Sequence, residues 1–464
     1  MARNDDVVDA SLCPEYNRLV GSYDVIIVGG GPAGLFSALE LSRNPNLKVL
    51  LLEKGKDIDE RTNIVSGLGG AGAFSDGKLT LSPKAGGHLA EYVGEAAAEK
   101  LIQHVDKAWL DFGAPDKVYG TGAGIADIER RASLAGLRLV PLPVRHLGTE
   151  RCPAVLRAIR DHLKNLIEIR VNTPVASILQ TGGRVSGVET ASGEIIEAKN
   201  VIAAPGREGA DWMMKQAKAL GLSLATNPVD VGVRVELPNA ILDNLTSVLY
   251  EAKLEYQSKS FDDRIRTFCM CPQGTVVRET TGGDDPVTTV NGQSFASHDS
   301  PNTNFALLVS TQFTEPFKEP IAYGKYIARL ANILGGGVLV QRLGDLKKGR
   351  RSTKERIDRG LVRPTLESAT PGDLSFVLPY RHLTGLLEML EAMDELSPGV
   401  ASDHTLLYGV EVKFYSSRPK LTSGFETELP GLFAIGDGAG ISRGLVQASA
   451  CGVVAARAIL AKQG

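Results

Sequence analysis

Residues 25–35 read VIIVGGGPAGL, and this stretch decides the first part of the fold. A β-branched strand over 23–29 (YDVIIVG) leads into the glycine turn, and a helical pattern follows over 35–44 (LFSALELSRN). A second strand is predicted over 48–55 (KVLLLEKG). This order predicts a βαβ unit whose two parallel strands are buried.

The turn carries three glycines, Gly29, Gly31 and Gly34, at the spacing G-x-G-x-x-G. In order, they permit a tight turn, close approach of the backbone to a pyrophosphate, and close packing of helix on strand. Glu53 follows 24 residues after Gly29, where its carboxylate can accept both ribose hydroxyls of an adenosine and would repel a 2'-phosphate. By itself, a glycine turn of this kind does not indicate a ligand, because a turn between a strand and a helix often uses glycine for steric reasons only. Strand, turn, helix, strand and acid agree here, so a dinucleotide-binding unit is predicted.

Composition narrows the class of protein. The 464 residues are 43% hydrophobic and 23% charged with a net charge of −3, which is typical of a globular chain of two or three domains. The chain has no basic excess that would favour nucleic acid as a partner. Five cysteines, an odd number, favour a reducing compartment. The N-terminal residues lack the apolar region of a signal peptide, and no apolar run reaches the length of a membrane span, so we expect a cytoplasmic protein.

The pattern along the chain predicts an α/β fold with a discontinuous first domain over 23–226 and 405–464. Residues 1–22 are expected to form a tail. Residues 227–404 are expected to form a mixed-sheet α+β substrate domain. Further predicted elements are helices over 89–112 and 153–166, a strand over 167–175, an antiparallel meander over 185–204, and substrate-domain strands over 229–237, 264–271 and 304–313.

Residues 23–55 resemble the FAD-binding motif of the glutathione-reductase-type flavoproteins, and GLFAIGDGAG over 431–440 resembles their second FAD motif. The resemblance implies a Rossmann-like FAD-binding domain in which Asp437 binds the ribityl chain. It also implies that the next helix aims its N-terminus at the flavin pyrimidine, which would stabilise the anionic reduced flavin. VIAAPGREG over 201–209 stands where that family has a strand and glycine turn, with Pro205 in place of the usual threonine.

Nearly the whole chain resembles a group of bacterial and archaeal FAD-dependent dehydrogenases. It is more distantly similar to the geranylgeranyl reductases, which reduce isolated C=C bonds with reduced FAD. The strings that carry the closer resemblance are GLGGAGAFSDGKLTLSP (67–83), RHLGTE (145–150), RTFCMCPQGTVV (266–277), NGQSF (291–295), QRLGDLKKGRRST (341–353) and KFYSSRP (413–419).

The glycine-rich loop that follows the second strand, over 67–79, is expected to run past the isoalloxazine, although a tight glycine loop would have the same composition. FAD is expected to bind without a covalent bond. The residues expected to bind it are Gly29, Gly31, Pro32, Ala33, Gly34, Glu53, Lys54, Gly70, Ala71, Gly72, Gly206, Gly436, Asp437, Gly444, Leu445 and Val446.

Four side chains are candidates for catalysis: Lys78 to stabilise negative charge, His146 and Tyr415 to move a proton, and Cys269 beside the substrate. Each also has a plain alternative as a solvated or packing residue. His298 is a second histidine of this kind, and Arg443 is a candidate to balance charge on the reduced ring.

Cys269 and Cys271 form a C-x-C pair on a predicted strand, so their side chains are expected on one face. A redox pair, a metal half-site and simple packing all fit, but no second cysteine pair or histidine cluster completes a metal set, so no metal is predicted. The basic run KKGRR over 347–351 either docks an acidic partner or forms a solvated face.

These features predict hydride transfer between flavin N5 and an organic substrate, as dehydrogenation or C=C reduction. A flavin monooxygenase and a non-catalytic flavin-binding or sensor subunit are the alternatives. A second, separate G-x-G-x-x-G unit for NAD(P)H is not visible, so electrons are expected to pass through an external carrier such as ferredoxin, a quinone or NAD(P)H. The absence of a CxxxxC pair disfavours a dithiol reductase.

Overall fold

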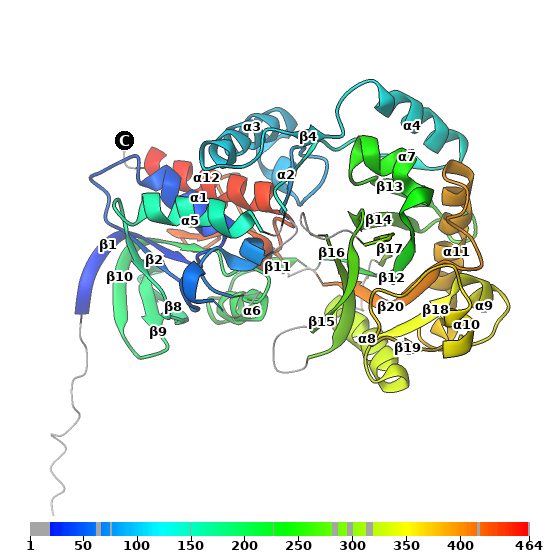
Figure 1. Cartoon of the computed structure of the whole chain (residues 1–464). Helices are drawn as coiled ribbons and strands as arrows, with labels where there is room; N and C mark the ends of the chain where they lie inside the picture. The colour runs from blue at the N-terminus through cyan, green and yellow to red at the C-terminus, as the bar shows by residue number, and fades with distance from the viewer. Residues whose placement is uncertain are drawn as a thin grey trace, which may run out of the picture.

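The computed structural model describes residues 19–61, 66–74, 77–148, 150–225, 227–280, 286–294, 300–311, 319–414 and 418–462. Two sheets dominate them and lie in separate halves of the molecule, one on the left and one on the right of Figure 1. Among the described residues, no helix combines the length and apolar character needed to cross a membrane.

The first sheet has the strand order β7-β2-β1-β10-β9-β8, with β22 beside β10. β1 lies between β2 and β10 and is parallel to both, whereas β8, β9 and the start of β10 form the predicted antiparallel meander. Val25, Ile26 and Ile27 have no exposed surface, as expected for a central parallel strand covered on both faces. The strands are β1 (Leu19–Val28), β2 (Val49–Leu52), β7 (Glu168–Arg170), β8 (Val175–Thr181), β9 (Arg184–Thr190), β10 (Ile195–Ala203) and β22 (Leu432–Ala434).

Helices α1 (Pro32–Leu41), α3 (Glu95–Asp111), α5 (Cys152–Leu163) and α12 (Leu445–Ala461) lie above this sheet in Figure 1. α12 packs closely on α1, because a Cβ at Gly452 would come within 2.2 Å of the Ala33 carbonyl oxygen. The N-terminal and C-terminal stretches of the chain therefore share one core. Shorter elements of this half are η1 (Ile58–Glu60), η2 (Gly70–Phe74), α2 (Leu89–Val93), α6 (Ala210–Ala219) and η4 (Asp437–Ala439).

The second sheet has the order β19-β18-β20-β12-β17-β14-β13-β5. The three strands predicted for the substrate domain are β12, β14 and β17, which are neighbours in it. The strands are β5 (Arg138–Leu139), β12 (Val229–Pro238), β13 (Leu254–Gln257), β14 (Arg264–Cys271), β17 (Asn302–Thr311), β18 (Leu339–Arg342), β19 (Thr370–Pro371) and β20 (Leu406–Lys413).

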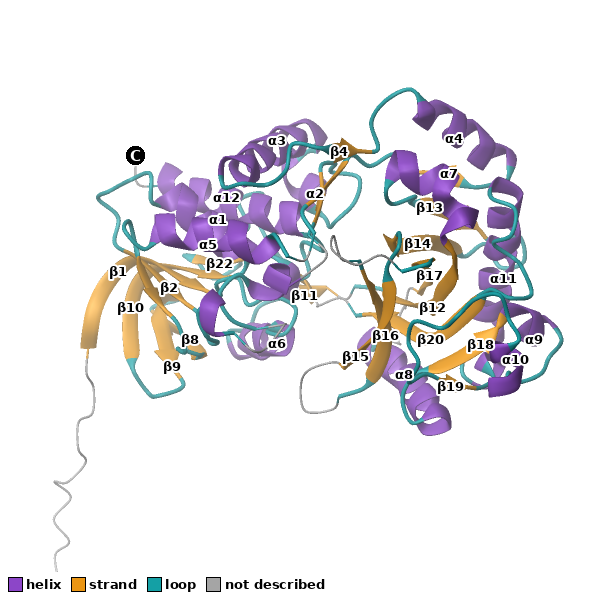
Figure 2. Cartoon of the chain, viewed as in Figure 1, coloured by secondary structure: helices purple, strands orange, loops and turns teal. Residues whose placement is uncertain are grey.

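Helices flank the second sheet, and the separate hairpin of β15 (Thr275–Thr280) and β16 (Thr288–Gln293) lies on the side that faces the first half (Figure 2). The helical elements are α4 (Gly124–Leu134), α7 (Asn239–Leu249), α8 (Pro320–Gly335), α9 (Leu343–Lys347), α10 (Lys354–Asp358), η3 (Leu374–Phe376) and α11 (Tyr380–Leu396).

Two small sheets complete the fold. One has the order β3-β6-β4, with β6 antiparallel to both neighbours. The other pairs β11 with β21. Their strands are β3 (Lys78–Thr80), β4 (Val118–Tyr119), β6 (Val144–His146), β11 (Leu224–Ala225) and β21 (Arg418–Pro419).

Several element limits differ from the sequence prediction. β1 begins at Leu19, inside the expected tail. The single helix expected over 89–112 is two helices, because Gly94 has a φ of +82° that ends α2 before α3 begins. Residues 405 onward were assigned with the first domain, but β20 pairs with β12 and β18 in the second sheet. β5, far upstream, also joins that sheet through β13. The domain limits themselves stay a prediction.

Candidate functional site

The first glycine turn is fixed by its own packing at two positions. Gly29 has a φ of +107°, and a Cβ there would lie 2.2 Å from the Ala204 carbonyl oxygen. A Cβ at Gly34 would lie 1.9 Å from the Gly29 carbonyl oxygen. Contacts this short cannot be relieved by rotating a side chain, so both glycines are required by the fold alone.

Gly31 and Gly444 differ, because nothing in the polypeptide requires glycine there. Their φ values are −77° and −168°, which any residue adopts. A Cβ at Gly31 would meet only the Gly70 Cα at 3.8 Å, and one at Gly444 only the Gly86 Cα at 3.9 Å, both ordinary contacts. Each of these glycines leaves open space at a helix N-terminus, although the packing of the chain would allow a side chain there. Such space fits the close approach of a phosphate or a ring.

Glu53 follows β2 and is 5% exposed. Its carboxylate accepts hydrogen bonds from the backbone N–H groups of Gly30 (2.8 Å), Gly55 (2.9 Å) and Gly67 (3.1 Å). It therefore joins the glycine turn to the loop after β2. Its neighbour Lys54 pairs instead with Glu208 at 3.2 Å.

The loop after β2 lies against both predicted FAD motifs. A Cβ at Gly70 would be 3.0 Å from the Gly31 Cα. A Cβ at Gly72 would be 2.7 Å from Leu445 Cδ2 and 3.2 Å from Pro32 Cγ. Ala71 lies between these two contacts in η2. The loop thus spans the N-termini of α1 and α12.

Arg61 orders this loop from outside the predicted set. Its Nη1 donates to the carbonyl oxygens of Leu68 (2.9 Å) and Gly70 (2.8 Å). An arginine nine residues before the glycine it holds gives no recognisable pattern, and the sequence analysis missed it.

The second motif places Asp437 at the start of η4, behind Gly436, whose φ is +77°. Ser442 Oγ donates to Asp437 Oδ1 at 2.6 Å, and Arg207 Nε lies 3.7 Å from Oδ2. Burial raises the pKa of Asp437 above its ordinary value, while Arg207 and Ser442 oppose that rise. The Asp437 side chain is 22% exposed, and a carboxylate with so few partners is suited to accept hydrogen bonds from ligand hydroxyls.

The turn over 201–209 supports that motif. A Cβ at Gly438 would lie 2.4 Å from the Gly206 carbonyl oxygen and 2.8 Å from Pro205 Cγ. Gly206 itself has a φ of +66° with open space around the position of a Cβ. Pro205, the departure from the resembled family, therefore packs tightly beneath η4.

The N-terminus of α12 is held in place from the segment that precedes α2. Gln447 Nε2 donates to the Ala85 carbonyl at 2.7 Å, and the N–H of Arg443 donates to the Gly86 carbonyl at 2.7 Å. Leu445 and Val446 form the first turn, and Val446 is buried. The helix end is consequently rigid and carries a positive dipole end.

These residues fit FAD on the observations above: two open glycines at the N-termini of α1 and α12, a buried acid after β2, and a partly exposed acid behind a left-handed glycine. The two motifs also meet directly, because a Cβ at Gly436 would lie 3.2 Å from Ala33 Cβ in α1. The individual roles of these residues remain predictions.

Two of the predicted catalytic residues, Lys78 and His146, both lie next to Tyr250. Lys78 in β3 and His146 in β6 are cross-strand partners. His146 Nε2 and the Tyr250 hydroxyl are 2.9 Å apart, and Lys78 Nζ lies 5.6 Å from the centre of the Tyr250 ring. Ser294 Oγ is 3.1 Å from the same hydroxyl. Tyr250 has a φ of +58°, a strained backbone for a bulky residue that often marks a functional site.

Lys78 also connects this cluster to the cysteine pair. Its Nζ donates to the Met270 carbonyl, between Cys269 and Cys271, and pairs with Glu251 at 3.3 Å. β14 is bulged between Phe268 and Cys271, and Cys269 has a φ of +46°, so the alternation expected of a regular strand does not apply there.

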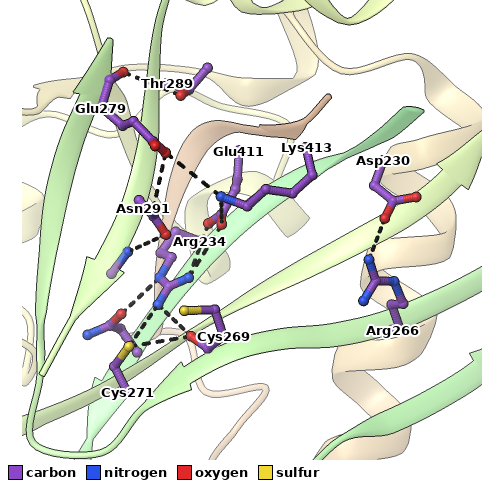
Figure 3. A network of polar contacts seen from close by, with 12 residues as sticks. Asp230, Arg234, Arg266, Cys269, Cys271, Glu279, Thr289, Asn291, Glu411 and Lys413 are labelled. Carbon is purple, nitrogen blue, oxygen red and sulfur yellow. Dashed lines mark hydrogen bonds and ion pairs between the residues drawn. The ribbon is translucent and has the colours of Figure 1, made fainter. Parts of the chain in front are cut away.

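A network of charged side chains, centred on the buried Arg234 and Glu411, contacts the cysteine strand β14 (Figure 3). Arg234 has no exposed surface; its Nε donates to Asn304 Oδ1 at 2.8 Å, and its Nη1 lies 3.4 Å from the Glu411 carboxylate. Lys413 Nζ pairs with Glu411 at 3.0 Å and lies 3.9 Å from Glu279. Burial alone would lower the pKa of Arg234, but Glu411 raises it, so the guanidinium stays charged.

Other predicted sites stand as follows. Tyr415 and His298 lie outside the described residues. Arg443 lies near His88, with Nη2 to Nε2 at 3.4 Å. In the basic run, Lys348 pairs with Asp403 (3.1 Å) and Arg350 with Asp345 (2.8 Å). That run is therefore partly neutralised by carboxylates of its own half. Among the described residues, no cluster of His, Cys, Asp and Glu is arranged to hold a metal.

Comparison with known proteins gives two family matches. Residues 24–250 match the family described as FAD dependent oxidoreductase, and residues 228–414 match the family described as FAD-dependent protein, C-terminal domain-like. An uncharacterized protein of Clostridium beijerinckii is 28% identical over 480 residues, which cover 94% of this chain and 80% of that protein.

Two solved structures align with most of the chain. The 3-ketosteroid-delta4-(5alpha)-dehydrogenase of Rhodococcus jostii has a TM-score of 0.44 and 16% identity, over 96% of this chain and 98% of the other. A geranylgeranyl bacteriochlorophyll reductase-like protein of Thermoplasma acidophilum has a TM-score of 0.37 and 14% identity, over 94% and 78%. At these values the likeness assigns no residue and no substrate.

Proposed function

Because the chain is an FAD-dependent oxidoreductase, we propose that it transfers a hydride between flavin N5 and a carbon of a small organic substrate, with the cluster of Lys78, His146 and Tyr250 moving the proton. When bound, the flavin supplies the hydride chemistry, and the protein supplies position and electrostatics. We also propose, from the resemblance of its motifs, that the chain belongs among the bacterial and archaeal FAD-dependent dehydrogenases.

The contacts of Tyr250 carry this proposal. Its hydroxyl lies between His146 Nε2 and Ser294 Oγ, which gives a chain of groups able to donate and accept one proton. Lys78, which lies over the ring, begins β3 only six residues after Gly72 of the cofactor loop. A proton relay continuous with the loop that contacts Pro32 and Leu445 is well situated for substrate chemistry.

The electron partner is proposed from the sequence. The G-x-G-x-x-G spacing occurs at Gly29 and again at Gly67, but only the first of these two turns joins a β-strand to an α-helix. An external carrier such as ferredoxin, a quinone or transiently bound NAD(P)H would therefore exchange electrons with the flavin. The four described cysteines are not in disulfide bonds, which favours a reducing compartment and hence the cytoplasm.

The test follows the flavin absorbance band of the purified protein under anaerobic conditions, with NADH, NADPH and reduced ferredoxin offered in turn and air then readmitted. Fast bleaching by one donor with slow reoxidation supports a reductase, and unsaturated substrates are then screened as oxidants. Bleaching by a metabolite instead supports a dehydrogenase. The proposal fails if neither donors nor a broad metabolite panel change the band of the FAD-loaded protein.

A further inference from the structure

The bulge in β14 holds two cysteines in an unusual backbone. Cys269 has a φ of +46°, and the pairing of β14 with β17 shifts register between Phe268 and Cys271. A non-glycine residue stays in the left-handed region only where its surroundings determine it, and such strain concentrates at functional sites. The bulge therefore gives a reason to ask what its two thiols can do.

Two cationic side chains from different strands donate hydrogen bonds to this bulge. Arg234 Nη2 in β12 donates to the Cys269 carbonyl at 2.7 Å and to Cys271 Sγ at 3.4 Å (Figure 3). Lys78 Nζ in β3 donates to the Met270 carbonyl. The charged and titratable groups around the Cys269 sulfur are Lys78, Arg234, Lys413, Glu251, Glu411 and Cys271.

These surroundings give the two thiols different pKa values, and the two side chains also differ in exposure. A hydrogen bond from Cys271 lowers the pKa of Cys269 below its usual range, and Lys78 and Arg234 lower it further against burial and Glu251. The hydrogen bond to Cys269, together with burial, raises the pKa of Cys271. Cys269 is also partly exposed, whereas Cys271 has no exposed surface. One reachable thiolate therefore stands beside one buried thiol.

We propose that Cys269 and Cys271 form a thiol–disulfide exchange site whose partners are low-molecular-weight disulfides. The Cys269 thiolate attacks one sulfur of the small disulfide, the S–S bond breaks, and one thiolate leaves. Cys271 gives its proton to that leaving thiolate and attacks the Cys269 sulfur. The second small thiolate is released as the Cys269–Cys271 bond forms. The cysteine pair loses two electrons, and the small disulfide gains them.

Oxidation of this pair would reach the proposed proton relay. It removes the negative charge beside Lys78, whose ammonium also lies over the Tyr250 ring. The inference does not depend on the hydride substrate, and its test counts thiols rather than turnover, so its failure and that of the proposed function are distinguishable.

The experiment uses the full FAD-loaded chain in a Cys13→Ser background, because Cys13 lies outside the described residues. Cys152 and Cys451 serve as internal controls: both are buried, and burial raises the pKa of Cys451 to about 12. The protein is incubated with glutathione disulfide at pH 7, unfolded in acid, alkylated and mapped by mass spectrometry. We expect the peptide with Cys269 and Cys271 to be lighter by two hydrogen atoms and to carry no glutathione.

Two variants separate the steps. Cys271→Ser should retain one glutathione on Cys269, and Cys269→Ser should leave Cys271 unmodified. Modification of Cys271 in Cys269→Ser, or an unmodified Cys269 in Cys271→Ser, would overturn the proposal. The protein with both cysteines present provides a check that does not depend on whether a variant folds. In it, iodoacetamide should alkylate Cys269 at pH 7 faster than it alkylates free glutathione, whose thiol is mostly protonated at that pH. An ordinary pH profile with its midpoint near about 8.5 would contradict the thiolate assignment.

Discussion

Lys78 and His146 are cross-strand partners in β3 and β6, and both reach Tyr250, which follows α7 and lies 104 residues after His146 in the chain. The two strands belong to the small sheet, while α7 flanks the second sheet. Tyr250 thus connects the loop side of the cofactor region with the substrate half, and its hydroxyl is the natural place to test the proton relay.

Replacing Tyr250 with Phe should slow the substrate-dependent reaction of the flavin by roughly 10²- to 10⁴-fold, the usual worth of a general acid or base. FAD binding should persist, since the change removes only the Tyr250 hydroxyl, which lies within hydrogen-bond distance of His146 and Ser294. Stopped-flow absorbance measures the rate. Tyr119→Phe is the matched control, because this neighbour contacts the Tyr250 ring at 5.1 Å between centroids. Equal rates for wild type and Tyr250→Phe would exclude the relay.

Alanine at Gly31 or at Gly444 should leave the fold intact but weaken FAD binding by about tenfold or more, equivalent to about 1.4 kcal/mol or more. The added methyl meets only ordinary contacts within the chain and enters the space left for the cofactor. Fluorescence titration of the apoprotein with FAD gives the affinity, and thermal unfolding reports the fold.

Gly34→Ala is the contrasting variant, because its methyl would collide with the Gly29 carbonyl oxygen. It should lower the unfolding temperature of the apoprotein itself. If Gly31→Ala destabilised the apoprotein as much as Gly34→Ala does, the open space at Gly31 would have no special relation to a ligand.

Arg234→Met should destabilise the protein by about 3–5 kcal/mol, because it leaves Glu411 buried with Lys413 as its remaining cation. Urea unfolding, read as the shift in midpoint at constant slope, measures the loss. Arg138→Met is the control: this arginine is 77% exposed and pairs with Glu255 at 3.7 Å, so its loss should cost less than about 1 kcal/mol. Similar losses for both variants would mean that the network in Figure 3 adds little.

His382 should make stability fall in mild acid. Burial lowers its pKa from 6.5 to about 4, and Thr311 Oγ1 lies 2.8 Å from its Nε2. Between those two pKa values the unfolded chain binds the proton and the folded chain does not. Its contribution, at most about 3 kcal/mol, is therefore complete above pH 6.5 and is lost as pH falls towards 4.

The measurement compares urea unfolding of wild type and His382→Gln between pH 4 and pH 7. Glutamine keeps a polar partner for Thr311 but does not titrate, so the stability difference between the two proteins should change across this window. A constant difference would mean that His382 does not contribute to the pH dependence.

Local patterns predicted the parts of the fold that depend on neighbouring residues. The strand, glycine turn and helix from Val25 to Leu41 follow from periodicity and from the steric needs of Gly29 and Gly34, and the structure has them as expected. The strands at 229, 264 and 304 were likewise predicted, as extended segments between loops rich in Gly, Asp and Pro. Their order in the sheet was not, because strand pairing joins segments far apart in sequence.

The candidate site, like the fold, was predictable only where a local sequence pattern marks a residue. Lys78, His146 and Cys269 were identifiable as chemically capable side chains, but no local pattern indicated that they share an environment. Tyr250 was missed because it ends an ordinary amphipathic helix, and its left-handed backbone has no signature without a glycine. Arg234 was missed because an alternating strand such as 229–237 is expected to turn an arginine outward, whereas here Glu411 of β20 compensates its burial.

The most direct test of the account is the flavin content of the purified chain. Acid precipitation should release the yellow cofactor into the supernatant as FAD, close to one molecule per chain, with none left on the polypeptide, because we propose that the two motifs hold the pyrophosphate and ribityl parts of a single molecule without a covalent bond. Release of FMN instead of FAD, or a colourless protein that takes up no FAD on titration, would contradict the role assigned to the glycine turn, to Glu53 and to Asp437.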